Sequence, residues 1–166
     1  MTLTTWTMFL GPASAVTSVE VAGVSVIGFP TYHDSEKGAK RGRNTVYLIE
    51  IDDVSVCHLG DLGHPLDDTD AEIVSSVDVL LVPVGGRTAI NAVEAAEVVR
   101  QLEPRFVVPM HYAVPGLKLQ LEGVERFLKE MAVTSSEPQP KLSVQATSSS
   151  EWETKVVVLE PKAEPR

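Results

Sequence analysis

The stretch TVYLIEIDDVSVCHLGDLGH, residues 45–64, joins two predicted strands to a cluster of polar residues. In residues 45–51, Tyr47, Ile49 and Ile51 alternate with Leu48 and Glu50, and this pattern is typical of a strand with one buried face. An Asp-Asp pair separates this run from residues 54–59, and the arrangement predicts a β-hairpin. Beyond the second strand, glycines lie on both sides of Asp61. They let the backbone turn sharply, so that the carboxylate can point at an ion.

The remaining chain predicts a mixed α/β fold. Upstream, residues 19–21 and 24–29 predict another hairpin, which turns at Gly23 and closes at Pro30. Downstream, helices and strands are expected to alternate: a short helix capped by Asp68 or Thr69 and ending near Ser76, a buried strand over 77–84, a helix from a Thr88 cap to Leu102, a strand over 106–108, an amphipathic helix over 117–131 and a last strand over 155–159. Hairpins followed by such units indicate an α/β sandwich layered around a sheet.

Composition and charge exclude several classes of protein. The chain has 166 residues, which favours a single domain. Its net charge of −9 disfavours nonspecific binding to nucleic acid, although a local basic patch can still hold a small anionic substrate. No apolar run is long enough to span a membrane. The one cysteine, Cys57, excludes an intrachain disulfide and fits a reducing cytoplasm.

The histidines and one aspartate suggest a metal site. His33, Asp61 and His111 each follow a predicted strand, so they are expected at the carboxyl ends of neighbouring strands. Imidazole and carboxylate together suit zinc, iron or manganese better than calcium. Their wide separation in the sequence leaves a plainer interpretation open, in which these polar groups only satisfy the backbone of loops.

A series of motifs resembles the metallo-β-lactamase superfamily, and within it the ascorbate-6-phosphate-lactonase-like Zn-dependent hydrolases. The motifs occur in one order: Tyr32-His33-Asp34, then residues 41–45, 57–64 and 78–86, and finally Pro109-Met110-His111-Tyr112. The resemblance covers about residues 18–161. It implies an α/β fold of the αββα sandwich type and a site for two zinc ions, with manganese or iron as alternatives.

The resemblance also implies roles for single residues. His33 matches a ligand of the first metal ion, Asp61 matches the aspartate that bridges both ions, and His111 matches a ligand of the second. Asp61 is therefore the expected catalytic residue, because it would hold the ions that activate water. His58 matches a position that is not a ligand. His64 is a candidate substrate-binding residue, with a structural role in its loop as the alternative.

Four cations follow His33 within a short loop, at Lys37, Lys40, Arg41 and Arg43. Arg41 is the candidate for binding a phosphate or carboxylate of the substrate, since arginine can contact such groups with two hydrogen bonds. The alternative interpretation is a solvated loop without a function in binding.

One departure from the superfamily pattern limits the resemblance. The His-x-His-x-Asp-His motif is missing, and no histidine precedes His33. We therefore expect an N-terminally incomplete fold, with residues 1–17 atypical, 18–161 forming a truncated domain and 162–166 frayed. With few ligands left, metal binding should be weaker than in an intact relative.

Two functions follow from these observations. The first is a cytoplasmic metal-dependent hydrolase whose metal-activated water attacks a lactone, ester or phosphoester in a small, anionic substrate. The second is an inactive remnant that acts through self-association or partner binding, because uncovered strands tend to pair with another chain. A homo-oligomer is expected, without nucleic acid or membrane partners.

Overall fold

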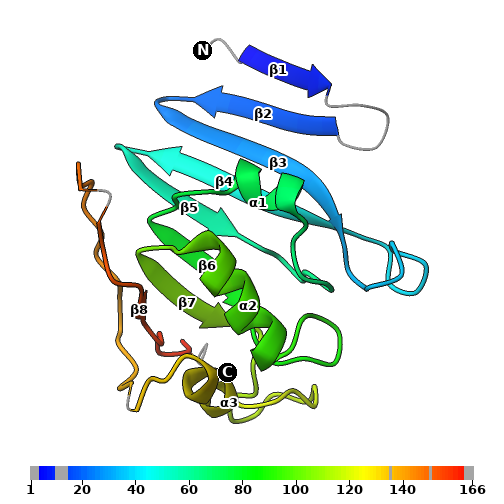
Figure 1. Cartoon of the computed structure of the whole chain (residues 1–166), viewed down its shortest axis with the longest axis vertical. Coiled ribbons are helices and arrows are strands. Elements are labelled where there is room, and N and C mark those ends of the chain that lie inside the picture. Colours follow the sequence, from blue (N-terminus) through cyan, green and yellow to red (C-terminus); the bar gives the residue numbers. More distant parts are fainter. Residues whose placement is uncertain (1–3, 10–14, 135, 150, 163–166) are drawn as a thin grey trace.

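The computed structural model describes residues 4–9, 15–134, 136–149 and 151–162. These residues form one eight-stranded sheet whose strands follow chain order across it (Figure 1). The strands are β1 Thr4–Phe9, β2 Ala15–Val21, β3 Val24–Tyr32, β4 Arg43–Ile51, β5 Val54–His58, β6 Val79–Pro83, β7 Phe106–Met110 and β8 Lys155–Val156. Neighbours from β1 to β5 are antiparallel, and those from β5 to β8 are parallel.

Both predicted hairpins are confirmed, but Pro30 does not close its strand. β3 continues to Tyr32, and Pro30 pairs with Thr45 of β4. The last pair between β2 and β3 is Thr17 with Gly28. At Pro30, therefore, β3 has only β4 as a neighbour, and a residue without an N–H is tolerated. The same holds for Pro109, which lies beyond the last pair of β7 with β8.

The helices are α1 Asp68–Ile73, α2 Ala92–Leu102 and α3 Val124–Glu130. Both predicted caps are displaced along the chain. Asp67 caps α1 by accepting from the Asp70 N–H. Asn91 caps α2 and forms a capping box with Glu94, so Thr88 is not the cap. The reason is that Asn91 and Glu94 have the three-residue spacing that satisfies two helix N–H groups reciprocally.

The predicted helix over 117–131 is wrong in its first half. Only Val124–Glu130 is helical, and Gly123 precedes it without a side-chain cap. The chain before it bonds instead to the loop after β6, where the Glu122 N–H donates to the Gly85 carbonyl. Leu117 and Leu119 are consequently exposed.

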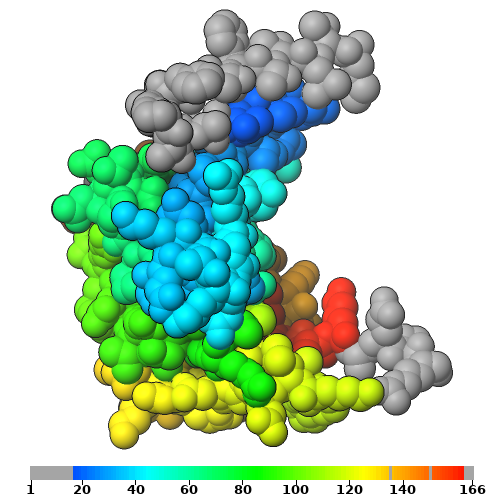
Figure 2. All heavy atoms as spheres, turned by 90° about the vertical axis from the view of Figure 1, so that its right-hand side faces the viewer, coloured from blue at the N-terminus to red at the C-terminus, as the bar shows by residue number. Residues whose placement is uncertain are grey.

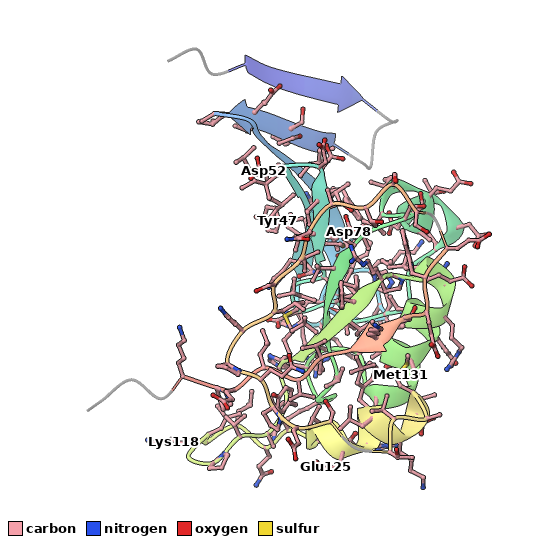
Figure 3. All side chains as sticks on the ribbon, turned by 90° about the vertical axis from the view of Figure 1, so that its left-hand side faces the viewer. Tyr47, Asp52, Asp78, Lys118, Glu125 and Met131 are labelled. Carbon is pink, nitrogen blue, oxygen red and sulfur yellow. The ribbon has the colours of Figure 1, made fainter. Side chains whose placement is uncertain are left out.

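The core lies on one face of the sheet. Helices α1 and α2 cover this face (Figure 1), where side chains such as Val46, Leu48 and Leu80 join one hydrophobic cluster. The opposite face has no helix over it among the described residues (Figure 3). Figure 2 shows this open face as a hollowed surface. The described residues thus supply one sheet and one helix layer of the α/β sandwich that we expected.

Candidate metal centre

The three expected ligands come from three strand ends. His33 follows β3, Asp61 follows β5 by three residues, and His111 follows β7 directly. The sheet therefore brings together residues that are far apart in the sequence. The Asp61 side chain is 48% exposed, whereas those of His33 and His111 are each 23% exposed.

His33 is held by a close approach between two loops. The Gly63 N–H donates to the Tyr32 carbonyl at 3.0 Å. A Cβ atom on Gly63 would lie 2.2 Å from the His33 carbonyl carbon, so only glycine fits there.

The loop after His33 is organised by the carboxylate of Asp34. It accepts the backbone N–H groups of Glu36, Gly38, Lys40 and Arg41 at 2.6–3.0 Å. Burial alone would raise the pKa of Asp34, but these four hydrogen bonds outweigh it and hold the pKa below its ordinary value. Asp34 therefore fixes the loop as a carboxylate.

Asp61 is positioned by a buried amide, that of Asn44. Asn44 Oδ1 accepts the Asp61 N–H at 3.0 Å, and Asn44 Nδ2 donates to Thr31 Oγ1 and to the Leu59 carbonyl, both at 2.8 Å. Gly60 has a φ of +62°, and a Cβ atom there would lie 2.4 Å from Asn44 Oδ1. The sharp turn that the glycines predicted is confirmed at Gly60.

His111 has a left-handed backbone, with a φ of 52°. Histidine adopts this conformation more often than most residues, and outliers of this kind are common at functional sites. Its ring lies between two groups. Nδ1 is 3.5 Å from Asp61 Oδ1, and Nε2 is 3.2 Å from Thr88 Oγ1.

Asp61 faces a different histidine with each carboxylate oxygen. Oδ1 is 3.5 Å from His111 Nδ1, and Oδ2 is 3.8 Å from His33 Nε2. Two ligand atoms on one tetrahedral zinc ion are about 3.4 Å apart. Each pair therefore has nearly the spacing of two ligands on a common ion, with Asp61 shared between the pairs.

The three side chains form two histidine–aspartate pairs, His33 with Asp61 and His111 with Asp61, rather than one group of three ligands around a single ion. In the part of the chain that the structure describes, no group of three or more His, Cys, Asp or Glu side chains is arranged to hold one ion. This agrees with two histidines that face opposite oxygens. The Nε2 atom of His33 is buried and has no hydrogen-bond partner, an unusual condition for a polar atom that a metal ion would relieve.

A cleft of about 720 Å³ on the open face of the sheet contains part of the site. Asp61 and His111 line it together with Arg43, Asn44, Thr45, Tyr47, Ile49, His58, Gly60 and Met110. His58 Nδ1 accepts the Gly60 N–H at 3.0 Å, so His58 supports the turn beside Asp61.

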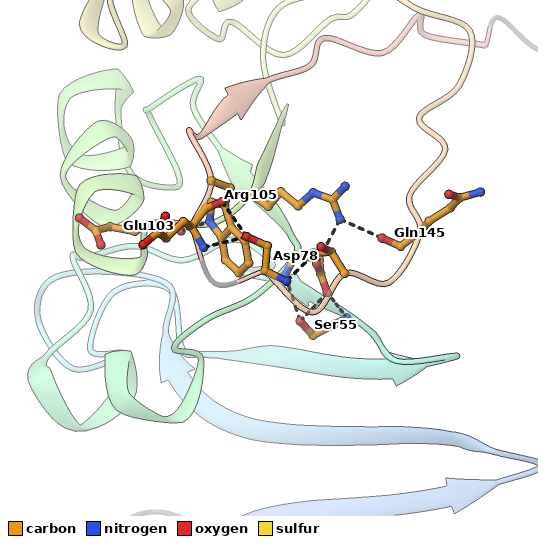
Figure 4. A network of polar contacts seen from close by, with 9 residues as sticks. Ser55, Asp78, Glu103, Arg105 and Gln145 are labelled. Carbon is orange, nitrogen blue, oxygen red and sulfur yellow. Dashed lines mark hydrogen bonds and ion pairs between the residues drawn. The ribbon is translucent and has the colours of Figure 1, made fainter.

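A larger cleft of about 1420 Å³ lies elsewhere and contains none of the predicted site residues. Its buried carboxylate, Asp78, is already satisfied (Figure 4). Asp78 Oδ2 accepts from the Ser55 N–H at 2.9 Å, and Asp78 Oδ1 lies 3.7 Å from Arg105 Nη1. Arg105 also donates to the Gln145 carbonyl. These contacts join the C-terminal segment to the sheet, so we assign this cleft a structural role.

The two expected substrate-binding residues lie outside the cleft around Asp61. The His64 ring is tilted against Tyr32 with centroids 6.1 Å apart, and its Nδ1 lies 2.7 Å from the Pro65 carbonyl oxygen. Arg41 is exposed and donates to the Arg87 carbonyl at 2.9 Å. Their roles in binding stay predictions. Asn44 is a supporting residue that sequence reasoning missed, and only its tertiary contacts reveal this role.

Comparisons with known proteins identify the family. A family model described as a beta-lactamase superfamily domain matches residues 6–111. A solved structure from Thermotoga maritima, described as a proposed Zn-dependent hydrolase of the metallo-β-lactamase superfamily, is 34% identical with a TM-score of 0.67 and covers 92% of this chain and 72% of that one. The chain therefore belongs to the metallo-β-lactamase superfamily.

A curated relative agrees with this family, and a more distant solved structure shares the fold. A UPF0173 metal-dependent hydrolase of Pyrococcus horikoshii is 35% identical over 68% of this chain and 52% of its own length. The chain spans about half the length of the curated relatives it matches. A metallo-β-lactamase fold protein of Bacillus subtilis shares the fold at 11% identity, with a TM-score of 0.55 over 85% of this chain and 48% of that one. Within the described residues, no helix has the length and apolarity to cross a membrane.

Proposed function

We propose that this chain carries part of a metal-dependent hydrolase site, in which His33, Asp61 and His111 bind divalent metal ions and Asp61 is shared between two ions. The observation that supports this most is the placement of each Asp61 oxygen toward a different histidine, at 3.5 and 3.8 Å. Zinc is the proposed metal, with manganese or iron as alternatives, because the donors are imidazole and carboxylate.

Bound metal would supply a Lewis acid and an activated water at neutral pH. The residues of the chain hold and orient this chemistry. Asn44 fixes the backbone of Asp61, and Gly63 allows the loop of His33 to approach. Among the described residues, one histidine and Asp61 would hold each ion, so we expect binding weaker than that of a site with three protein ligands.

The proposed substrate is a small molecule with a lactone, ester or phosphoester bond. The cleft beside Asp61 offers the apolar surfaces of Tyr47 and Met110 and the cation of Arg43. Arg43 and Arg41 could attract an anionic group of the substrate, since arginine forms two parallel hydrogen bonds with carboxylate or phosphate. A cytoplasmic location remains a prediction.

The test is hydrolysis by the zinc-loaded chain of three chromogenic probes, a thiolactone, a nitrophenyl ester and a bis-nitrophenyl phosphate. Asp61→Ala should abolish metal-dependent turnover. The matched control is Asp68→Ala, which removes an exposed carboxylate in the first turn of α1. Equal turnover by wild type and Asp61→Ala on all three probes would refute the proposal.

A second candidate function is association through the open face of the sheet. Tyr47 is 45% exposed and Ile51 is 43% exposed on this face, close to further apolar side chains of β2 and β3. Exposed apolar patches commonly mark protein interfaces. We propose that a second copy of the chain binds here.

Light scattering tests this association. The double variant Tyr47→Asp, Ile51→Asp should shift a dimer to a monomer. Val93→Asp places the same charge on a similarly exposed apolar residue of α2 and should leave the mass unchanged. A wild-type chain that is monomeric at high concentration would exclude the interface.

A further inference from the structure

His58 supports the turn beside Asp61 with one ring nitrogen, and its other ring nitrogen has no assigned role. We propose that His58 is a substrate-binding residue whose Nε2–H donates a hydrogen bond to an anionic oxygen of the substrate. The inference rests on the proposed function, because it specifies how the cleft beside Asp61 holds its substrate. It starts from the contact of the first nitrogen, the 3.0 Å hydrogen bond from the Gly60 N–H to Nδ1.

This hydrogen bond determines which nitrogen of His58 carries the proton. A backbone N–H can only donate, so Nδ1 accepts and offers its lone pair to Gly60. In a neutral imidazole the proton is then on Nε2, which becomes a donor. The turn is fixed at this point, since a Cβ atom on Gly60 would lie 2.4 Å from Asn44 Oδ1. The N–H that sets the tautomer therefore stays in place.

The Nε2–H of His58 faces the cleft and is not used by the protein. His58 is half-buried and lines the cleft of about 720 Å³ together with Asp61 and His111. Nε2 is farther from the backbone than Nδ1, so it lies on the part of the ring that extends away from the sheet. Within the described ranges, no residue forms a hydrogen bond with Nε2, and Nε2 is not one of the buried polar atoms without a partner. The donor is therefore open to a molecule in the cleft.

The other walls of the cleft suit an apolar molecule with one anionic group. Tyr47 is paired directly with His58 across β4 and β5, and it is 45% exposed. Its ring lies against β3, where a Cβ atom on Gly28 would be 3.4 Å from Tyr47 Cε1. Arg43 adds a cation to the cleft and forms no ion pair with any described residue. An anionic oxygen is the acceptor that such donors bind most strongly.

Long-range ¹H–¹⁵N correlation spectra of the histidine rings test the donor in the wild-type chain. Spectra are recorded at about pH 8, above the ordinary histidine pKa, with and without Zn²⁺, and the His58 signals are assigned with His58→Asn. We expect His58 to be protonated on Nε2, and this signal to shift saturably as phenylphosphonate or benzoate is added. Asp61 repels an anion in the metal-free chain, so both probes should bind more tightly in the zinc-loaded form.

The choice of probes identifies the group that His58 binds. Phenylphosphonate and benzoate carry the same aromatic ring with a phosphonate or a carboxylate, and the tighter probe shows which anion the cleft prefers. Benzyl alcohol keeps the ring and an oxygen but has no charge. It should bind about 10-fold more weakly than the tighter anion, because hydrogen bonds to charged groups are stronger. Equal affinity for benzyl alcohol would contradict an anion site.

Two variants separate the two nitrogens of His58. Asparagine has an amide oxygen near the position of Nδ1, so His58→Asn keeps an acceptor for the Gly60 N–H and removes the distal donor. Glutamine has an amide N–H near the position of Nε2, so His58→Gln keeps the donor and removes that acceptor. In the metal-free form, His58→Asn should bind the tighter probe about 10-fold more weakly than the wild type, and His58→Gln should bind it equally well. Zn²⁺ affinity should show the reverse order, because only His58→Gln loosens the turn beside Asp61.

The outcomes separate this inference from the proposed function. Signals of His58 that respond to no probe, a His58 ring protonated on Nδ1, or wild-type probe affinity in His58→Asn would overturn the role of His58 and leave the metal site intact. Equal losses of probe affinity in both variants would show that His58 only supports the turn, which also contradicts the inference. Absence of Zn²⁺ binding by the wild type would refute the proposed metal site, whereas the titrations of the metal-free chain would still decide whether His58 binds an anion.

Discussion

The two faces of the sheet are built from the same strands but have different surroundings. In β4, Val46 is fully buried beneath the helices, while its neighbour Tyr47 projects on the other side and is 45% exposed (Figure 3). In β6, Leu80 is fully buried and Leu81 is only partly buried. Both faces are apolar, yet only one has a helix layer among the described residues.

This difference shows what a strand pattern does and does not encode. Alternation with a period of two specifies which side chains share a face. It does not specify what covers that face. The proposed metal centre lies at the rim of the open face, where Asp61 and His111 line a cleft with Tyr47, so the less covered face is also the chemically interesting one.

The largest contrast should appear in stability. Leu80→Ala removes a buried side chain from the covered face and should destabilise the chain by about 2–5 kcal/mol, through lost burial and a cavity. Ile51→Ala, on the open face, should cost less than about 1 kcal/mol. Urea denaturation of both variants measures the difference. Equal costs would show that the open face is covered in solution, which would favour association.

Asn44, which is buried near the start of β4, should have the next largest effect. Asn44→Ala removes the partners of the Asp61 N–H, the Leu59 carbonyl and the Thr31 hydroxyl. We expect a loss of about 1–3 kcal/mol in thermal unfolding, because unsatisfied buried polar groups are costly, together with weaker Zn²⁺ binding. Wild-type affinity in this variant would separate Asn44 from the positioning of Asp61.

Asp34 gives a smaller, pH-dependent effect at the same rim. Its pKa is held below the ordinary value of 3.8, so the charged form is favoured by folding. Its contribution to stability is therefore complete above pH 3.8 and is lost as the pH falls through the lowered pKa of the folded state. Asp34→Asn should be less stable than wild type in urea at neutral pH, and the gap should close at low pH. A gap that is constant with pH would contradict this role.

The smallest effect concerns the access of a reagent to the Cys57 thiol, and it is measured on the wild-type chain. Cys57 and His58 are neighbours in β5 that face the covered and the open side respectively. Burial raises the pKa of Cys57 to about 12. Iodoacetamide should therefore leave native Cys57 unmodified and label it in urea, as mass spectrometry can show. Rapid labelling of the native chain would mean that the covered face opens.

The sequence predicts the central strands well because their signals are local, but it predicts neither β1 nor the first residues of β2, where no clear period of two is present. The hairpins over β2–β3 and β4–β5 follow from a period of two and from Gly23 and Asp52-Asp53 as turn signals. The helix starts were harder to predict. Thr88 resembles a cap, but the pair Asn91 and Glu94 binds the helix N–H groups better.

The sequence could single out the three side chains that meet at this rim, but not the groups that support them. His33, Asp61 and His111 are suggested as ligands by their side-chain types and by a family resemblance, and their role as ligands stays a prediction. Asn44 has no local signal, since it holds the backbone of a residue 17 positions away in the chain. Contacts of this kind depend on how the loops meet in three dimensions.

The most direct test of the account is the zinc content of the purified chain after loading and dialysis, measured by mass spectrometry for wild type, His33→Ala, His111→Ala and Asp61→Ala. Because Asp61 faces both histidines, its variant should lose the most zinc, and each histidine variant should lose part of it. Asp61→Ala that retains as much zinc as the wild type would contradict a metal centre built on this carboxylate.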